Sequence, residues 1–136
     1  MKVILEEGGF LPTSSHEDDA GYDLYSRTRK VILARSRETF DIGVHVELPK
    51  GTMGYITSRS GLNRKHGITC EGVVDCGYTG SISVTLLNHT DEPYLVDEGD
   101  RIAQLVVVPI LKPELEVVTE FKETDRGNNG FGSSGK

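Results

Sequence analysis

The chain has few cysteines and no long apolar segment. Its two cysteines, Cys70 and Cys76, are too few for a disulfide scaffold and lack the close pairing of a zinc knuckle. The most apolar stretch, Ile102–Ile110, contains Gln104 and is about half as long as a membrane-spanning helix. The N-terminal stretch MKVILEEGGF has no sustained apolar segment of the kind found in secretory signals. These features predict a cytoplasmic protein with no membrane association.

Positive charge is also in short supply. Lys and Arg number 15 against 21 Asp and Glu, which gives a formal net charge of −6. Non-specific binding to nucleic acid depends on clustered positive charge, so we expect no nucleic-acid partner. The length of 136 residues is typical of a single domain, and the 36% hydrophobic content is typical of a globular one.

Glycine, in contrast, is abundant, and it falls in clusters that end short runs rich in Val and Ile. Within Phe40–Leu48 the apolar residues take every second position, as in a half-buried strand. Regularly spaced short strands predict an all-β sandwich, jelly roll or barrel. The expected strands are Lys2–Leu5, Lys30–Ala34, Phe40–Leu48, Met53–Thr57, Ser81–Asn88, Tyr94–Val96, Ile102–Ile110 and Glu114–Glu120.

One segment has the features of a helix. Ser60–Gly67 begins with a possible N-cap serine, carries basic residues in its last turn and ends in glycine. It is too short to be stable alone, so we expect one short helix packed on the sheet.

The C-terminal segment has a different composition from the rest of the chain. From Thr124 onward it is polar and rich in Gly, Ser and Asn, which predicts a domain of residues 1–123 and a mobile arm of residues 124–136. A frayed terminus is the simplest interpretation of such a tail. An isolated aromatic, Phe131, with Arg126 upstream favours instead an arm that closes over an anionic ligand.

Two segments have the composition of phosphate sites. Ser58–Gly61 opens the expected helix, where free backbone N–H groups, hydroxyls and Arg59 suit an anion, although an ordinary N-cap has the same composition. The arm offers a second such site through Arg126, Ser133, Ser134 and its glycine amides. Two phosphate sites in an acidic chain indicate a small polyphosphate ligand that carries Mg²⁺.

Three polar residues are candidates for catalysis or metal binding. Asp75 ends an apolar run, where its carboxylate can activate a water molecule or simply start a turn. Gln104 interrupts a strand that prefers apolar residues, so it needs a hydrogen-bond partner or a function. Asp23 can hold a metal-bound water or satisfy nearby backbone amides.

Five clusters of glycine with polar residues occur in order along nearly the whole chain. Together they resemble the five motifs of the trimeric, all-β deoxyuridine triphosphate nucleotidohydrolase (dUTPase) family. The clusters are Ala20–Leu24, Ser58–Gly61, Gly72–Gly80, Gly99–Leu105 and Arg126–Gly135.

The resemblance implies a jelly-roll-like β-barrel that assembles as a homotrimer, with active sites shared between subunits. The reaction would be Mg²⁺-assisted attack of water on the α-phosphorus of dUTP, giving dUMP and pyrophosphate. That reaction would limit uracil incorporation into DNA and supply dUMP for dTMP synthesis. Asp75 would activate the water, Gln104 would help hold it, and Asp23 would bind the metal through an outer-sphere water.

The resemblance also implies which residues bind the substrate. Tyr78 would pack against the deoxyribose and exclude UTP, while the backbone of the hairpin at Gly72, Val74 and Gly80 would bind uracil. The phosphates would be bound by Arg59, Ser60 and Gly61. The arm of a neighbouring subunit would add Phe131 over uracil and, around the γ-phosphate, Arg126, Gly132, Ser133 and Ser134.

The chain departs from the family pattern in a few places. Ser58 stands where proline is frequent, Asn129 where glycine is frequent, and Ser134 where threonine is common. The segment Ile68–Gly72 is shorter than in many members and lacks their asparagine. A dCTP deaminase of the same fold and a regulatory nucleotide-binding trimer are the alternative functions, although the deaminase motifs are not evident and the arm favours hydrolysis.

Overall fold

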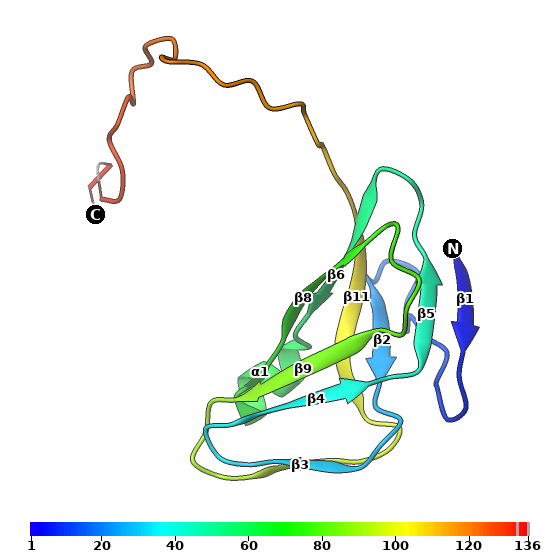
Figure 1. Ribbon diagram of the computed structural model, residues 1–136. Coiled ribbons are helices and arrows are strands. Elements are labelled where there is room, and N and C mark those ends of the chain that lie inside the picture. Colours follow the sequence, from blue (N-terminus) through cyan, green and yellow to red (C-terminus); the bar gives the residue numbers. More distant parts are fainter. Residues whose placement is uncertain (133, 136) are drawn as a thin grey trace.

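The computed structural model describes residues 1–132, 134 and 135. These residues form eleven strands and one short helix, which confirms the predicted all-β class (Figure 1). The helix is α1 (Ser60–His66), and the strands are β1 (Lys2–Leu5), β2 (Tyr22–Tyr25), β3 (Lys30–Ile32), β4 (Arg37–Asp41), β5 (Val44–Glu47), β6 (Thr52–Thr57), β7 (Ile68–Thr69), β8 (Glu71–Asp75), β9 (Ser83–Asn88), β10 (Tyr94–Val96) and β11 (Arg101–Pro109).

All the strand pairs are antiparallel. The largest sheet has the order β2-β11-β6-β8, a second has the order β4-β9-β7, and β1-β5 and β10-β3 form separate pairs. Leu24 and Leu105 of the first sheet and Phe40 and Leu86 of the second are fully buried in one cluster. The inner faces of the two larger sheets therefore share a single hydrophobic core, which holds the loops at the sheet ends in place.

The predicted strand Phe40–Leu48 is split in two. Its alternating apolar residues are all buried, as expected, but the chain turns at Gly43, where φ is +64°. A Cβ at this position would lie 2.5 Å from the Arg27 guanidinium, so only glycine fits. As a result β4 pairs with β9 while β5 pairs with β1.

Two strands, β2 and β7, were not expected from the sequence, and β8 was expected only as part of the Gly72–Gly80 hairpin. β2 and β8 overlap glycine-containing clusters, and β7 has only two residues, so none of them shows a clear alternation of its own. They form because each pairs with a neighbouring strand: β2 with β11, β8 with β6, and β7 with β9. Between β7 and β8, the Ser58 hydroxyl accepts a hydrogen bond from the N–H of Cys70 (2.8 Å) and donates one to its carbonyl (3.0 Å).

The predicted strand Glu114–Glu120 is wrong for the single chain. No described residue after Pro109 belongs to a strand, and the side chains of Leu115 and Val117 are almost completely exposed. A strand needs a neighbour to pair with, and here the chain runs away from the body of the molecule (Figure 1). Among the described residues, none belongs to a helix long and apolar enough to cross a membrane.

Candidate active site

The hairpin after β8 carries the first group of candidate residues. β8 ends at Asp75, and the Tyr78 N–H donates to the Asp75 carbonyl (2.9 Å) to close the turn. The Tyr78 hydroxyl then donates to the Ser81 carbonyl (2.9 Å), which lays the ring across the loop. A Cβ at position 80 would collide with this ring, so the observed position of Tyr78 requires glycine at position 80.

An open pocket of about 390 Å³ and a smaller one of about 270 Å³ lie at different places on the molecule. The smaller one is formed by the hairpin and by apolar residues of the sheet, and Asp75 stands exposed at its rim. An apolar floor with backbone polar groups and one carboxylate suits a flat heterocycle joined to a charged group. The lining residues are Ile56, Gly72, Val73, Val74, Asp75, Tyr78, Ile82 and Ser83.

The second group is built around the buried carboxylate of Asp23. The Asp23 side chain is 8% exposed, and its two oxygens accept from Arg59 Nε (2.9 Å) and an Arg101 terminal nitrogen (3.3 Å). One buried carboxylate therefore holds two guanidinium groups side by side. Arg59 binds Asp23 through Nε, and among the described residues its terminal nitrogens make no hydrogen bond or ion pair, so their N–H groups can donate to an anion.

The larger pocket adjoins this ion-pair cluster. It is lined by Arg59, Leu62, Tyr94, Val96, Gly99, Asp100, Arg101 and Ile102. Arg101 was not among the residues selected from the sequence, although it belongs to the cluster Gly99–Leu105. The Gly-Asp-Arg pattern was the available signal, but it is also typical of an ordinary turn that enters a strand.

The helix α1 starts beside Arg59, as predicted, and ends at Gly67 in the left-handed conformation. The expectation that Ser60 is the N-cap is wrong. Arg59 holds that position with an extended backbone, and no side chain of a described residue caps the helix. The backbone N–H groups of Ser60 and Gly61 therefore lie in the uncapped first turn, next to the Arg59 side chain.

Gln104 belongs to the same end of the sheet as Asp23 and Arg59. It lies on β11, where it is paired with Asp23 of β2 on one side and Thr57 of β6 on the other. The residue is partly buried between its buried neighbours Ala103 and Leu105.

The strand register separates the two groups within one chain. In the β6–β8 pair, Met53 lies opposite Asp75 and Thr57 lies opposite Glu71. Asp75 therefore lies beside one end of β6. The other end of the strand, from which the chain continues to Arg59, is four residues or about 13 Å farther along. A single chain does not bring Asp75 and Tyr78 together with Arg59 and Gln104.

The described residues of the arm join neither group. Arg126 Nε donates to the Asn129 carbonyl (3.0 Å) in a local turn, and the Phe131 side chain is fully exposed. Gly132 and Ser134 follow in the same exposed segment, far from the sheets (Figure 1). Ser133, which was also expected to bind phosphate, lies outside the described residues.

The donor set near Asp23 is suited to a metal ion only through water. Within the described residues, no three His, Cys, Asp or Glu side chains converge to hold a metal ion. Both Asp23 oxygens already accept a hydrogen bond from an arginine, yet each retains a lone pair for a water molecule. This arrangement fits the expected outer-sphere role toward Mg²⁺, with the ligand's own phosphates as the direct ligands.

The two cysteines lie in different environments. Cys70 is buried, and burial raises the pKa of its thiol to about 11. Cys76 is exposed and directly follows Asp75. The Cys76 thiol is therefore the accessible one of the two.

Comparisons with known proteins agree on one family. A family model described as dUTPase matches residues 9–135. The deoxyuridine 5′-triphosphate nucleotidohydrolase of Clostridium novyi is 43% identical, with 99% of each chain covered. The protein of the same name from Kluyveromyces lactis is 44% identical, with 100% of this chain and 94% of the relative covered.

Solved structures give the same result. The dUTPase of Staphylococcus bacteriophage 80alpha with dUpNHpp superposes with a TM-score of 0.93 at 32% identity, covering 99% of this chain and 98% of that one. A point mutant of the dUTPase from the S. aureus phage phi11, which coordinates a structural Mg(II) ion, superposes with a TM-score of 0.83 at 32% identity, covering 88% and 97%.

The difference between the thiols predicts selective alkylation. At pH 8 about one Cys70 thiol in a thousand is ionised, because its pKa is about 11, and burial blocks access as well. We therefore expect iodoacetamide to add one carbamidomethyl group to the folded chain, at Cys76, as located by peptide mass spectrometry. Unfolding in guanidinium should allow a second addition, and rapid labelling of folded Cys70 would contradict its buried position.

Proposed function

The chain belongs to the dUTPase family, and from that premise we propose that it hydrolyses dUTP to dUMP and pyrophosphate. The relatives match the chain over nearly its full length, and their name, deoxyuridine 5′-triphosphate nucleotidohydrolase, describes this reaction. The bacteriophage 80alpha dUTPase was solved with the dUTP analogue dUpNHpp. The observation that carries the proposal is the pocket of the β8 hairpin, where Tyr78 lies across the loop and Asp75 stands at the rim. By removing dUTP the enzyme would limit uracil incorporation into DNA and supply dUMP for dTMP synthesis.

The pocket supports a specificity for uracil attached to deoxyribose. The backbone at Gly72, Val74 and Gly80 supplies polar groups for the edge of the base, and close contact with this backbone leaves no room for a thymine methyl group. The Tyr78 ring, which is fixed by its bond to Ser81, would occupy the space of a ribose 2′-hydroxyl. UTP and dTTP would then be rejected by shape.

The chemical step needs an activated water molecule near the α-phosphorus. Asp75 is exposed at a strand end, where its carboxylate can accept a proton from water, and Gln104 would hold that water from the other side. A positioned base typically contributes about 10²- to 10⁴-fold, so other groups must stabilise the phosphate charge. We assign this role to Arg59, to the N–H groups of Ser60 and Gly61, and to Arg126, Gly132, Ser133 and Ser134 of the arm.

We propose Mg²⁺ as the cofactor, bound through the substrate. Bound Mg²⁺ would neutralise part of the triphosphate charge and align the α-phosphate. Asp23 would accept a hydrogen bond from a water of the metal while it keeps Arg59 oriented toward the phosphates. Because the protein has a net negative charge, the metal ion would also reduce the repulsion between the protein and the triphosphate.

We further propose that the active site forms only in a homotrimer. The support is the separation of Asp75 from Arg59 and Gln104 along β6. A second subunit can bridge this separation if its own Arg59 and Gln104 lie opposite the hairpin of the first subunit. Closed cyclic symmetry would then give each trimer three equivalent sites.

We propose that residues 124–136 act as an arm over a neighbouring active site, beyond a domain of residues 1–123. The arm's exposed Phe131 would cover the uracil, and its Arg126 would reach the γ-phosphate. Closure would exclude water other than the nucleophile, and opening would release the product.

Two other functions remain as outcomes of the tests. A dCTP deaminase would convert dCTP and leave its triphosphate intact. A regulatory trimer would bind dUTP without turnover; for phage dUTPases, solved structures are described in terms of control of virulence-gene transfer. The placement of Asp75 beside the pocket favours hydrolysis over both.

Selective release of pyrophosphate tests the proposed reaction. With Mg²⁺, we expect turnover of dUTP and little of dTTP, dCTP or UTP, measured by a coupled pyrophosphate assay. Asp75→Asn should lower kcat by about 10²- to 10⁴-fold while dUTP binding, measured by calorimetry, changes little. The variant keeps the size of the side chain and removes only its basicity.

Two outcomes would contradict these assignments. Folded wild-type protein that binds dUTP without turnover would favour the regulatory trimer. Near wild-type turnover of Asp75→Asn would remove Asp75 from the role of base.

A subunit-mixing experiment tests whether the site is shared. Asp75→Asn and Arg59→Gln should each be nearly inactive, and the glutamine that replaces Arg59 can still donate to the buried Asp23 carboxylate. If one site takes Asp75 and Arg59 from different subunits, random 1:1 trimers contain about one quarter intact sites. We therefore expect co-refolded variants to recover about that share of wild-type turnover, with each variant refolded alone as control. No recovery in a proven mixed trimer would place both residues of a site in one chain.

Truncation tests the role of the arm. Deletion of residues 125–136 removes a segment whose described residues are all exposed, so the thermal unfolding midpoint and the oligomeric mass should not change. Turnover of dUTP should fall at least about tenfold, because the arm's phosphate and uracil contacts are lost. A truncated protein that unfolds or dissociates would show that the arm is structural and not a lid.

A further inference from the structure

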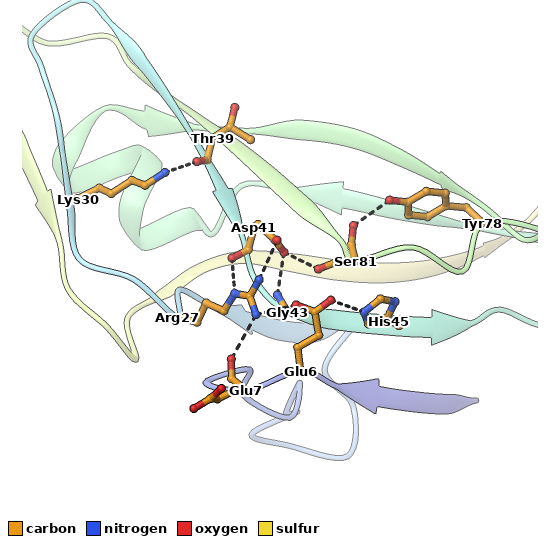
Figure 2. Close-up of polar contacts among 10 residues, drawn as sticks. All are labelled: Glu6, Glu7, Arg27, Lys30, Thr39, Asp41, Gly43, His45, Tyr78 and Ser81. Carbon is orange, nitrogen blue, oxygen red and sulfur yellow. Dashed lines mark hydrogen bonds and ion pairs between the residues drawn. The ribbon is translucent and has the colours of Figure 1, made fainter.

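His45 on β5 contacts the hairpin that carries Tyr78, although the two are far apart in the sequence. Its Nδ1 lies 2.7 Å from the Thr79 carbonyl. Its Nε2 lies 2.9 Å from a carboxylate oxygen of Glu6, a contact drawn in Figure 2. A carbonyl and a carboxylate can only accept hydrogen bonds, so both ring nitrogens must donate. Only the protonated imidazolium has both protons, and the neutral ring loses one of the two bonds.

The hairpin has a second anchor at Ser81, next to the His45–Thr79 contact. Asp41 accepts a hydrogen bond from the Ser81 hydroxyl through one oxygen and an ion pair from Arg27 (2.8 Å) through the other. Arg27 also binds Glu6 (2.8 Å), so the two anchors belong to one connected network (Figure 2). Thr79 and Ser81 flank Gly80, and the Ser81 carbonyl accepts the Tyr78 hydroxyl. The position of the Tyr78 ring therefore depends on both anchors.

The charges around His45 favour its protonated form. Glu6 and Asp41 carry two negative charges and Arg27 one positive charge, so an imidazolium makes the cluster neutral. On the other side, Lys2 and Glu47 line a cleft with His45 and neutralise each other in an ion pair of 2.8 Å. The hydrogen bond to Thr79, followed by that to Glu6, raises the pKa of His45 above its ordinary value of 6.5.

We propose that His45 is a positioning residue whose protonated side chain holds the Thr79–Ser81 segment, and through it the Tyr78 ring, in the conformation that accepts dUTP. The inference rests on the substrate-binding role of Tyr78 proposed above. A group with a raised pKa in the folded state contributes fully below its unfolded pKa near 6.5 and loses this contribution as the pH rises through its folded pKa. Binding of dUTP should therefore weaken as the pH rises above 6.5 and through the folded pKa of His45.

The first test compares wild type with His45→Gln between pH 6 and pH 9. The introduced glutamine does not titrate and cannot donate to Thr79 and Glu6 from two ring positions. At pH 6 we expect the variant to have a KM for dUTP about 3- to 10-fold higher than that of wild type, because it lacks one hydrogen bond to the hairpin. Its kcat should stay within about twofold of the wild-type value. The difference in KM should narrow toward the alkaline end of this range, as wild-type His45 loses its proton. The comparison cancels the ionisation of the triphosphate itself, because both proteins use the same substrate.

A matched control comes from the same strand pair. The double variant Lys2→Gln, Glu47→Gln removes both partners of the ion pair between β1 and β5, so the net charge beside His45 does not change. Among the described residues, neither Lys2 nor Glu47 makes a hydrogen bond or ion pair to the hairpin. The KM profile of the double variant should follow that of wild type at every pH. An equal KM difference for His45→Gln at pH 6 and pH 9, or a fall in kcat alone, would overturn the proposal.

The second test needs no activity. In nucleotide-free wild type, the His45 ring protons and the amide signals of Thr79, Gly80 and Ser81 should shift with one common midpoint above pH 6.5 in NMR titrations. Glu6→Gln keeps an acceptor but removes the charge, so this midpoint should move to lower pH. Amide signals that ignore the His45 titration would overturn the proposal even if His45→Gln fails to fold. Absence of dUTP turnover in wild type would instead overturn the proposed function, and the titration would still decide the role of His45.

Discussion

The antiparallel register of β6 between β8 and β11 is the constraint on which the site depends. It places Met53 opposite Asp75 at one end of β6 and Gln104 opposite Thr57 at the other. Because a strand is nearly rigid along its length, no side-chain movement can bring Asp75 to Arg59 in the same chain. Each chain therefore carries the two groups of candidate residues at opposite ends of this sheet. This separation is the reason for proposing a site shared between subunits.

The larger pocket shows how arginines can gather in an acidic protein. The net charge of −6 concerns the whole chain, whereas the pocket beside α1 brings together Arg59 and Arg101, which share the buried Asp23 carboxylate. Burying Asp23 is costly unless it is paired, and the two guanidinium groups supply the pairing while they are themselves fixed in orientation. The local arrangement of these side chains, and not the overall charge, is the basis for proposing a phosphate site here.

Many elements of the fold were predictable from the sequence because their signal is local. The alternation in Phe40–Leu48 identified a buried face correctly, and Gly67 correctly ended the helix. The interruption at Gly43 was not predictable, because its cause is the close approach of Arg27 from another loop. Glu114–Glu120 has the composition of a strand but no partner in its own chain, since pairing is a property of two segments and not of one.

By itself, the sequence determined the family, the all-β class and a set of candidate site residues, because the five glycine-containing clusters and the apolar alternation are recorded in neighbouring residues. Asp75, Tyr78 and Gln104 were selected on that basis. Only the tertiary structure decided that these residues divide between two ends of a sheet, that Arg101 shares Asp23 with Arg59, and that His45 contacts Thr79. The physical reason is that strand register and loop contacts join residues that are far apart in the chain, and no local pattern records such a pairing.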